Sequence, residues 1–411
     1  MPFPFTFTFP FDAPAGEPVV MKVRVAFASD PFDSSPTWTD LDADFLDFTM
    51  KKGRQHQLDR MEAGTATIIL NNSSGNYWPD NSGGSYYPNV LPGKRINVRV
   101  SYSLITYEVF TGFIESWKPS WRTGIGSTGA PIMTLTCAGV TKNLSRLWLN
   151  NAGEIEELSG ARVGNVLDEL NWPAGDRDID AGQSLLRATG SQENVNSLAH
   201  LHEVQRSELG IIFQAGDGDI QFQDRHARLK EPFLTSQATF GDDGGEHKYS
   251  TIDLSLDDQF IFNDVRLQRT GGSEQVADDA SSQADFAKRS LVRQGLLLTS
   301  DSEVSDQAEF LLSQFKSPAL RSKFIELKPR RDPDNLFPFC LDFDISTRIT
   351  VRLNQSSVDK DYHIEGITHS YNGQVRDWTT KWQLSDASKT DYWILGTAGY
   401  SEIGETTTLA F

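Results

Sequence analysis

The feature that most constrains the fold of this chain is a strand-loop-strand pattern that occurs twice, far apart. The stretch "RINVRV" fills residues 95–100 and is followed by "FTGFIESW", which contains Gly112. The stretch "RITVRL" fills residues 348–353 and is followed by "IEGITHSY", which contains Gly366. When the two leading arginines, Arg95 and Arg348, are aligned, apolar positions of the two stretches coincide. Shifting the alignment by one residue then makes Gly112 and Gly366 coincide. Two explanations stay open: chance, because amphipathic strands use few residue types, or a duplicated β module.

Apolar and polar residues alternate through much of the first 150 positions. A period of two places each apolar set on one face of a strand. Segments rich in Asn, Gly, Pro and Ser separate these strands, as in "NNSSGNYWPDNSGG" at 71–84. Several short strands with such turns predict an antiparallel barrel or sandwich.

The middle of the chain changes to helical spacing. Apolar residues at i, i+3, i+4 and i+7 predict a helix over 163–170, and a less regular pattern predicts another over 193–209. The stretch "GIIFQAGDGDIQFQDR" at 210–225 then predicts a hairpin around a Gly-Asp-Gly-Asp turn. We therefore expect a mixed α+β section here.

Strand-like alternation returns after this section and predicts a second β domain. The polar run at 271–283 is expected to be an exposed loop. Apolar spacing predicts one inserted helix, with Ser305 as its N-cap. Near the end, Asn372-Gly373 suits a type I′ turn between two strands.

These patterns divide the chain into five parts. We expect an N-terminal arm (1–18), a first β-barrel domain (19–150), an α+β middle domain (151–250), a second β-barrel domain with an inserted helix (251–388) and a C-terminal tail (389–411). The arm contains "FPFTFTFPF", in which proline limits regular strand pairing. We interpret it as an arm that docks on a neighbouring subunit or on the first barrel; folding back on its own domain stays open.

Charge and hydropathy exclude several classes of protein. The net charge of −18 argues against a surface that grips nucleic acid, which needs clustered Lys and Arg. The acidity fits ordinary solubility, and it also fits an acidic wall past which DNA slides. No apolar run approaches the length that spans a bilayer, and the N-terminus lacks the basic and apolar regions of a signal peptide. We expect a soluble protein made in the cytoplasm.

The cysteines and histidines show no metal-binding spacing. Cys137 lies in a strand-like run and is expected to be a small buried residue, while its pairing with Cys340 stays open. In "LAHLHEVQRSE", His200 and His202 are two residues apart, and Arg206 stands where a zinc-protease helix needs its second histidine. We expect surface histidines there.

The acidic stretch "DRDIDAGQS" resembles a calcium loop only in part. Asp176, Asp178 and Asp180 have suitable spacing, but the turn glycine, Gly182, comes one residue late, and Arg187 replaces the closing glutamate. We expect a solvated loop.

Nothing else in the sequence marks an active site. "GDDGGE" at 241–246 lacks the Lys and Ser/Thr of a phosphate loop, and no G-x-S-x-G occurs. Carboxylate pairs of the glycosidase kind stay open, because 56 acidic residues supply many chance candidates. We predict no catalytic, cofactor-binding or metal-binding residue, no cofactor and no enzyme activity.

Several stretches, in this order, resemble minor tail proteins of siphophages of the tail-tip or baseplate hub type. They are "KKGRQHQLDRMEAGTATIILNNSSGNYWPDN" with "LPGKRINVRV" and "FTGFIESW", "ARVGNVLDELNWPAGDRDIDAG" with "SELGIIFQAGDGDIQFQDRHAR", "IFNDVRLQRTGGSEQVADDASSQADFAKRSL" with "SDQAEFLLSQFKSPALRSKFIEL", and "DYWILGTAGYSEIGETTTLAF". The resemblance covers most of 40–411, and the first eighteen residues have no counterpart. Phe286-Ala287-Lys288 departs from the aromatic-Gly that the family usually has before "RS".

The resemblance implies a fold that is mainly β, with two tail-tube-like antiparallel β-barrel domains and a mixed α+β middle domain. It also implies a homotrimeric ring between the tail tube or distal tail protein above and the tip, fibre or tape-measure protein below. Three chains with two barrels each would present six similar sectors to a sixfold tube. The expected place is the virion tail tip, assembled in the host cytoplasm, with DNA passing through the channel.

Two rival functions belong to other classes. Nine tryptophans and the Tyr-Trp loop "NYWPDN" suggest a receptor- or glycan-binding tail module, although tryptophan also fills barrel cores. A tail-associated cell-wall hydrolase is the third hypothesis. Glycan-array binding would favour the second hypothesis, and zymogram activity would favour the third.

Overall fold

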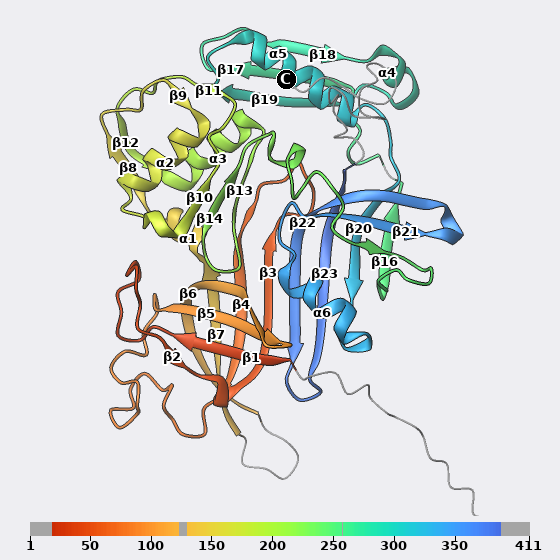
Figure 1. The fold of residues 1–411 in the computed structure, drawn as a ribbon. Helices are drawn as coiled ribbons and strands as arrows, with labels where there is room; N and C mark the ends of the chain where they lie inside the picture. The colour runs from red at the N-terminus through yellow and green to blue at the C-terminus, as the bar shows by residue number, and fades with distance from the viewer. Residues whose placement is uncertain (1–18, 123–129, 257, 388–411) are drawn as a thin grey trace, which may run out of the picture.

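The computed structural model describes residues 19–122, 130–256 and 258–387 (Figure 1). The predicted N-terminal arm and C-terminal tail therefore lie outside the described residues. The described part is mainly β, with one sheet of thirteen strands, four smaller sheets and six α-helices. Among these residues, no helix has the length and apolarity needed to cross a bilayer.

The N-terminal half of the large sheet follows the order β3-β4-β7-β6-β5-β1-β2, and its neighbouring strands are antiparallel. Alternate residues of these strands are buried, as the period of two predicted, and they form a continuous core. The strands are β1 (Val20–Val25), β2 (Thr39–Asp40), β3 (Phe45–Gly53), β4 (Glu62–Asn71), β5 (Arg95–Tyr102), β6 (Ile105–Arg122) and β7 (Ala130–Gly139).

The C-terminal half repeats this order. Its strands run β16-β20-β23-β22-β21-β15, so that β21, β22 and β23 take the places of β5, β6 and β7. The last pair, β15 with β21, is parallel, whereas its counterpart β1 with β5 is antiparallel. The strands are β15 (Thr239–Phe240), β16 (Thr251–Ser255), β20 (Arg321–Leu327), β21 (Arg348–Leu353), β22 (Val358–Asn372) and β23 (Asp377–Asp386).

The hydrogen-bond register tests the alignment of the two repeated patterns. The amide of Ile114 donates to the carbonyl of Lys94, and the amide of Ile364 donates to the carbonyl of Thr347. These bonds place Arg95 and Arg348, the next residues of β5 and β21, at matching positions, which confirms the first part of the alignment.

The second part of the alignment, which superimposed the two glycines, is wrong by four residues. Each half carries one extra residue, a β-bulge, after the matched isoleucine: Glu115 in β6 and Glu365 in β22. Gly366 therefore corresponds to Ser116 and not to Gly112. The error arose because the chain between the bonded residues is shorter in the second half, which the sequence pattern did not reveal.

The two halves join into one sheet, because β22 also pairs with β3, from Gly366 opposite Gly53 to Asn372 opposite Asp47. In Figure 1, β3, β22 and β23 lie side by side in the centre. One edge of β22 is shared, since β21 pairs with it before the bulge and β3 after it. No described strand pair closes either half into a barrel, so the predicted barrels are, in the described residues, two parts of a continuous open sheet.

The mixed α+β section lies between the halves. Its strands β13 (Ile211–Gln214) and β14 (Ile220–Gln223) form the predicted hairpin. Three helices accompany it: α1 (Val140–Leu144), α2 (Ser159–Glu169) and α3 (Ser197–Glu208). The remaining strands are β8 (Trp148–Asn151), β9 (Glu157–Leu158), β10 (Arg177–Ile179), β11 (Leu185–Leu186) and β12 (Gln192–Asn196).

The insertion in the second half is larger than the single helix predicted. It contains β17 (Asp264–Arg269), β18 (Gln275–Asp278), α4 (Ala280–Phe286), β19 (Ser290–Leu296) and α5 (Asp301–Phe315). β18 and the start of α4 occupy the run that was expected to be a loop. The N-cap of α5 is Ser300, whose hydroxyl accepts from the amide of Ser302, and not Ser305. Side chains of α5 share one apolar core with those of α3.

Two further differences concern local structure. A helix that was not predicted, α6 (Pro333–Asp342), follows β20, with its first proline at a position that needs no amide donor. The turn after Asn372 is a four-residue loop, because Asn372 pairs with Asp377, so the prediction of a type I′ turn is wrong. Short 3-10 helices occur at η1 (Asp42–Asp44), η2 (Ala174–Asp176), η3 (Ala227–Leu229), η4 (Pro329–Arg331) and η5 (Asn354–Ser356).

Candidate functional site

The seam where β3 meets β22 depends on two facing glycines. Gly53 has a φ of +89°, and a Cβ atom there would lie 2.3 Å from the carbonyl oxygen of Glu365. A Cβ on Gly366 would lie 2.6 Å from the carbonyl oxygen of Arg54. Only glycine permits this backbone approach without displacement of the strands.

A buried carboxylate lies at the same place, on the bulge of β22. The Glu365 side chain is fully buried and accepts hydrogen bonds from Arg54 Nε at 2.7 Å, Arg228 Nη1 at 2.6 Å and Ser385 Oγ at 2.6 Å. Burial alone would raise the pKa of Glu365, but the two guanidinium groups outweigh it and hold the pKa well below its ordinary value. The network ties β22 to the loop after β3 and to the segment after β14.

The two halves differ in the pairing of two strand edges, one on β6 and one on β16. In β22, the residues after the bulge pair with β3, whereas the equivalent residues of β6, from Ser116 onward, pair only with β7 among the described strands. In turn, β16 holds the position of β3, and β20 is its only partner among the strands that the structure describes. The register makes Trp121 the counterpart of Tyr371; Trp121 is 57% exposed and Tyr371 is 9% exposed.

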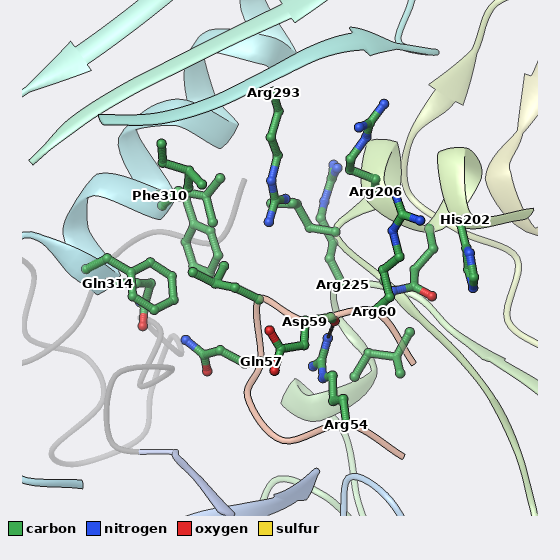
Figure 2. A pocket seen from close by; sticks show the side chains of 18 of the residues that line it. Arg54, Gln57, Asp59, Arg60, His202, Arg206, Arg225, Arg293, Phe310 and Gln314 are labelled. Atoms are coloured by element: carbon green, nitrogen blue, oxygen red, sulfur yellow. Dashed lines mark hydrogen bonds between the residues drawn. The ribbon is translucent and has the colours of Figure 1, made fainter. Parts of the chain in front are cut away.

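A cavity with a volume of about 650 Å³ lies where three parts of the chain meet (Figure 2). The loop after β3 forms one wall, α3 with the residues after β14 forms a second, and the inserted β19 and α5 form the third. Figure 2 shows arginine side chains gathered on one side of the cavity, with Phe310 and Gln314 opposite.

The lining of this cavity, which we call the arginine pocket, has a positive balance on an acidic protein. Three carboxylate residues line it, Asp59, Glu203 and Asp224, against twice as many arginines. The arginines are Arg54, Arg60, Arg206, Arg225, Arg228 and Arg293. An apolar wall of Phe, Leu and Ile side chains completes it. A pocket with convergent cations and apolar surface suits an anionic ligand that also carries an apolar group.

The arginines differ in how far they are neutralised. Arg54 and Arg228 share Glu365, and Arg225 forms an ion pair with Glu303 at 2.8 Å. The side chain of Arg293, in contrast, has no hydrogen bond or ion pair within the described part of the chain. Burial lowers its pKa to about 10, and the positive charges of Arg206 and Arg54 act in the same direction.

The structure places the two histidines of "LAHLHEVQRSE" on α3. His200 is only 3% exposed, so the expectation of a surface histidine is wrong for it; its Nδ1 lies 3.6 Å from a carboxylate oxygen of Glu203. His202 is half-buried and lines the arginine pocket, where burial lowers its pKa, followed by the charge of Arg60.

The carboxylates of the three aspartates of "DRDIDAGQS" do not converge on a common position where a calcium ion could bind. Asp176 forms an ion pair with Arg95 at 3.0 Å, and Asp180 accepts from the amide of Asp224. Asp178 belongs to β10, which pairs with β14, so the stretch is partly a strand and not the solvated loop expected. Within the described ranges, no group of three His, Cys, Asp or Glu residues is arranged to hold a metal ion.

Three other sequence candidates have structural roles. Cys137 and Cys340 are free and buried, so they do not pair. In "NYWPDN", Tyr77 is fully buried and its hydroxyl donates to Asp44 at 2.7 Å. The expectation of an exposed Tyr-Trp platform is therefore wrong for the tyrosine. In "GDDGGE", Glu246 forms an ion pair with Arg352 at 3.2 Å.

Sequence reasoning missed the arginine pocket entirely. Its arginines are scattered between positions 54 and 293, and no two of them form a recognised motif. The only available signal was the excess of arginine in one stretch, Arg225 to Arg228, directly after a predicted hairpin.

Comparison with known proteins identifies the fold. No family model and no curated protein matches the sequence. Among solved structures, the tail protein from Neisseria meningitidis MC58 is similar over 90% of this chain and 97% of its own, with 12% identity and a TM-score of 0.57. The 43 kDa tail protein of prophage MuSo2 from Shewanella oneidensis is similar over 90% of this chain and 99% of its own, with 10% identity and a TM-score of 0.56.

A chain of the Francisella PdpA-VgrG complex is also similar, over 90% of this chain and 58% of its own, with 9% identity and a TM-score of 0.51. At these identities the similarity concerns the fold alone. The expected resemblance to phage tail proteins thus holds at the level of the fold.

Proposed function

We propose that this protein is a structural hub of a phage or phage-like tail tip. In this role three copies form a ring that matches the sixfold tail tube to the threefold tip and lets DNA pass. The proposal rests above all on one observation, the repetition of one strand order in two halves that are joined edge to edge. The shared fold with tail proteins supports it.

The seam within the chain is a template for a seam between chains. β22 binds β3 beyond its bulge, and the equivalent part of β6 has the same bulge and an exposed edge. β16 of a second copy can pair there, because it holds the position of β3. Such a head-to-tail contact generates a ring when the rotation closes. Three copies with two halves each then supply six similar sectors.

The register of the internal seam specifies the expected contacts. Ser370 lies opposite Thr49, and Tyr371 lies opposite Phe48. Transferred to the edges, these pairs become Ser120 opposite Asp253 and Trp121 opposite Ile252 of the next copy. Burial of the exposed Trp121 ring at this contact explains why a large aromatic residue sits on an open edge.

The finer parts of the proposal follow from this ring. The two halves act as tail-tube-like barrels once neighbours complete them, with domain limits near 19–150, 151–250 and 251–388. The tail tube or distal tail protein lies above, and the tip, fibre or tape-measure protein lies below. The protein resides in the virion tail tip after assembly in the host cytoplasm. The net charge of −18 supports a channel that repels the DNA backbone.

In this role the protein is not an enzyme and needs no cofactor. The rival glycan-binding function loses support from the burial of Tyr77, which removes half of the suggested aromatic platform. A hydrolase function has no observation in its favour, since the arginine pocket holds mostly cations and not a pair of facing carboxylates.

A double-cysteine variant tests the ring. Ser120→Cys together with Asp253→Cys should yield disulfide-linked species of up to three chains on non-reducing gels. Cys137 and Cys340 are buried and should not interfere. The matched control, Ser120→Cys with Asp285→Cys, places the second thiol on the exposed surface of α4, away from the seam, and should not cross-link.

Light scattering and particle images provide the second measurement. The unmodified protein at high concentration should have the mass of three 45.8 kDa chains and appear as a ring with six lobes. A cross-linked pair that never proceeds to three chains, or equal cross-linking of the control, would refute the proposed seam.

A further inference from the structure

The arginine pocket has no role in the ring proposed above, because none of its lining residues belongs to β6 or β16. We propose that it binds the segment 388–411 of the same chain, through acidic side chains held by the arginines and aromatic side chains held by the apolar wall. This inference is independent of the proposed function.

Several guanidinium groups of the pocket have nitrogen atoms without a hydrogen-bond partner among the described residues. The side chain of Arg293 has no hydrogen bond or ion pair among the described residues, and Arg228 Nη2 and Arg206 Nε are buried with no hydrogen-bond partner there. Leaving charged donors buried and unsatisfied is costly. A carboxylate satisfies a guanidinium with two parallel hydrogen bonds, and it forms a stronger bond than a neutral acceptor.

The opposite wall of the pocket is apolar. Phe260, Phe310 and Phe315 line it together with Leu311 and Ile211. A cavity of about 650 Å³ is large enough for a few side chains, including an aromatic ring. An inorganic anion alone would leave this apolar surface uncovered.

The place where the described chain ends identifies the source of the occupant. Ser385 on β23 donates to Glu365, and Glu365 binds Arg54 and Arg228 of the pocket lining. The described chain stops two residues later, at Ala387, whose amide donates to the carbonyl of Asp361 on β22. The remaining chain therefore starts on the strand pair that carries Glu365 and Ser385, and at full extension it spans roughly 80 Å.

The sequence of that segment has the chemistry that the pocket requires. It carries Asp391, Glu402 and Glu405 against a single cation, Lys389. Aromatic residues lie close to these acids, as in "DYW" at 391–393 and "YSE" at 400–402. The charge is thus opposite to that of the pocket, although the chain as a whole is acidic.

A spin label on the full-length chain tests the proposal. A nitroxide is attached at Ser401→Cys, since Cys137 and Cys340 are fully buried and do not compete for the reagent. We expect the rotational correlation time of the label to fall at least threefold when Arg293→Glu is introduced. The less drastic Arg293→Gln should give a smaller fall, and circular dichroism checks that both variants are folded.

The matched control is Arg146→Glu, which makes the same charge change at a side chain that is 62% exposed and outside the pocket. It should leave the label as immobile as in the parent. An excess of the free peptide 388–411 should release the label, and the peptide with Asp391→Asn, Glu402→Gln and Glu405→Gln should not.

Several results would overturn the proposal. A label as mobile in the parent as in the free peptide would show that the segment does not bind. Equal effects of Arg293→Glu and Arg146→Glu would remove the pocket as the site. Release of the label on dilution would assign the segment to a second copy, and release by any acidic peptide of scrambled sequence would assign the pocket to another partner.

Discussion

The buried glutamate of the seam offers a sharp test of how the two halves are held together. The perturbation is Glu365→Gln, which keeps the shape of the side chain and removes its charge. In the native protein this carboxylate accepts from Arg54 at 2.7 Å, Arg228 at 2.6 Å and Ser385 at 2.6 Å. The variant leaves two buried guanidinium groups facing a neutral amide.

The magnitude follows from the complete burial of the group. Removing one partner from a buried ion pair costs about 3–5 kcal/mol, because the remaining charge stays out of water without compensation. The glutamine oxygen still accepts a hydrogen bond, which places the expected loss of unfolding free energy near the lower value, about 3 kcal/mol.

The pH dependence gives the sign of the effect independently. The pKa of Glu365 lies below its ordinary value of 4.5, so its contribution is fully present above pH 4.5 and decreases as the pH falls through the folded pKa. Each pH unit below the ordinary value removes about 1.4 kcal/mol. The difference between parent and variant should therefore shrink by roughly 2 kcal/mol between pH 7 and pH 3.

Urea denaturation followed by tryptophan fluorescence measures this difference, since Trp378 and Trp382 are buried on β23, the strand that carries Ser385. The control is Glu62→Gln, an exposed carboxylate of β4 whose ion pair with Lys51 spans 3.4 Å, with an expected effect below about 0.5 kcal/mol. A variant within about 1 kcal/mol of the parent at pH 7, or a difference that does not change with pH, would refute the reasoning.

Three further predictions follow from other groups. Gly53→Ala should lower the thermal midpoint more than Gly93→Ala. Both glycines have a positive φ, but only at Gly53 do backbone atoms occupy the place of the added Cβ. Equal shifts of the two midpoints would show that this steric clash does not affect stability. Burial, followed by neighbouring aspartates, raises the pKa of Asp219 to about 6, so the native state loses stability as the pH rises from 4 to 6. Asp219→Asn should thus stabilise the protein at pH 7 and not at pH 4, as thermal unfolding at both pH values would test. Burial raises the pKa of the Cys340 thiol to about 12, and it also raises that of Cys137, so a thiol reagent should modify neither until the protein unfolds; rapid reaction in buffer would contradict their burial.

The sequence predicted the elements that depend on local patterning. Alternation located β5 and β21, and helical spacing located α2, because burial of one face imposes the same period on any such element. The N-cap of α5 was misplaced by five residues, since Ser300 and Ser305 are both acceptable caps and only packing selects between them. The helix α6 was missed because prolines at both Pro333 and Pro338 concealed its pattern.

Features that depend on distant residues could not be predicted. The pairing of β3 with β22 brings Gly53 against Gly366, and neither glycine has a neighbour in sequence that indicates the other. The arginine pocket is a similar case, since each arginine reads as an ordinary surface cation until the fold brings it beside the others. The repeat was visible from residue types, but its register depended on the length of the chain between the bonded residues, which is shorter in the second half.

The pairing of β3 with β22 also has a consequence for biosynthesis. The ribosome completes β3 long before it makes β22, so the nascent N-terminal half carries a strand with one bare row of amide and carbonyl groups throughout elongation. Lys51 and Lys52, near the end of that strand, place positive charge beside the bare row and discourage two nascent chains from associating through it. A fragment that ends after β7 would retain this exposed row permanently and should precipitate on expression, whereas the complete chain covers the row with its own last hairpin.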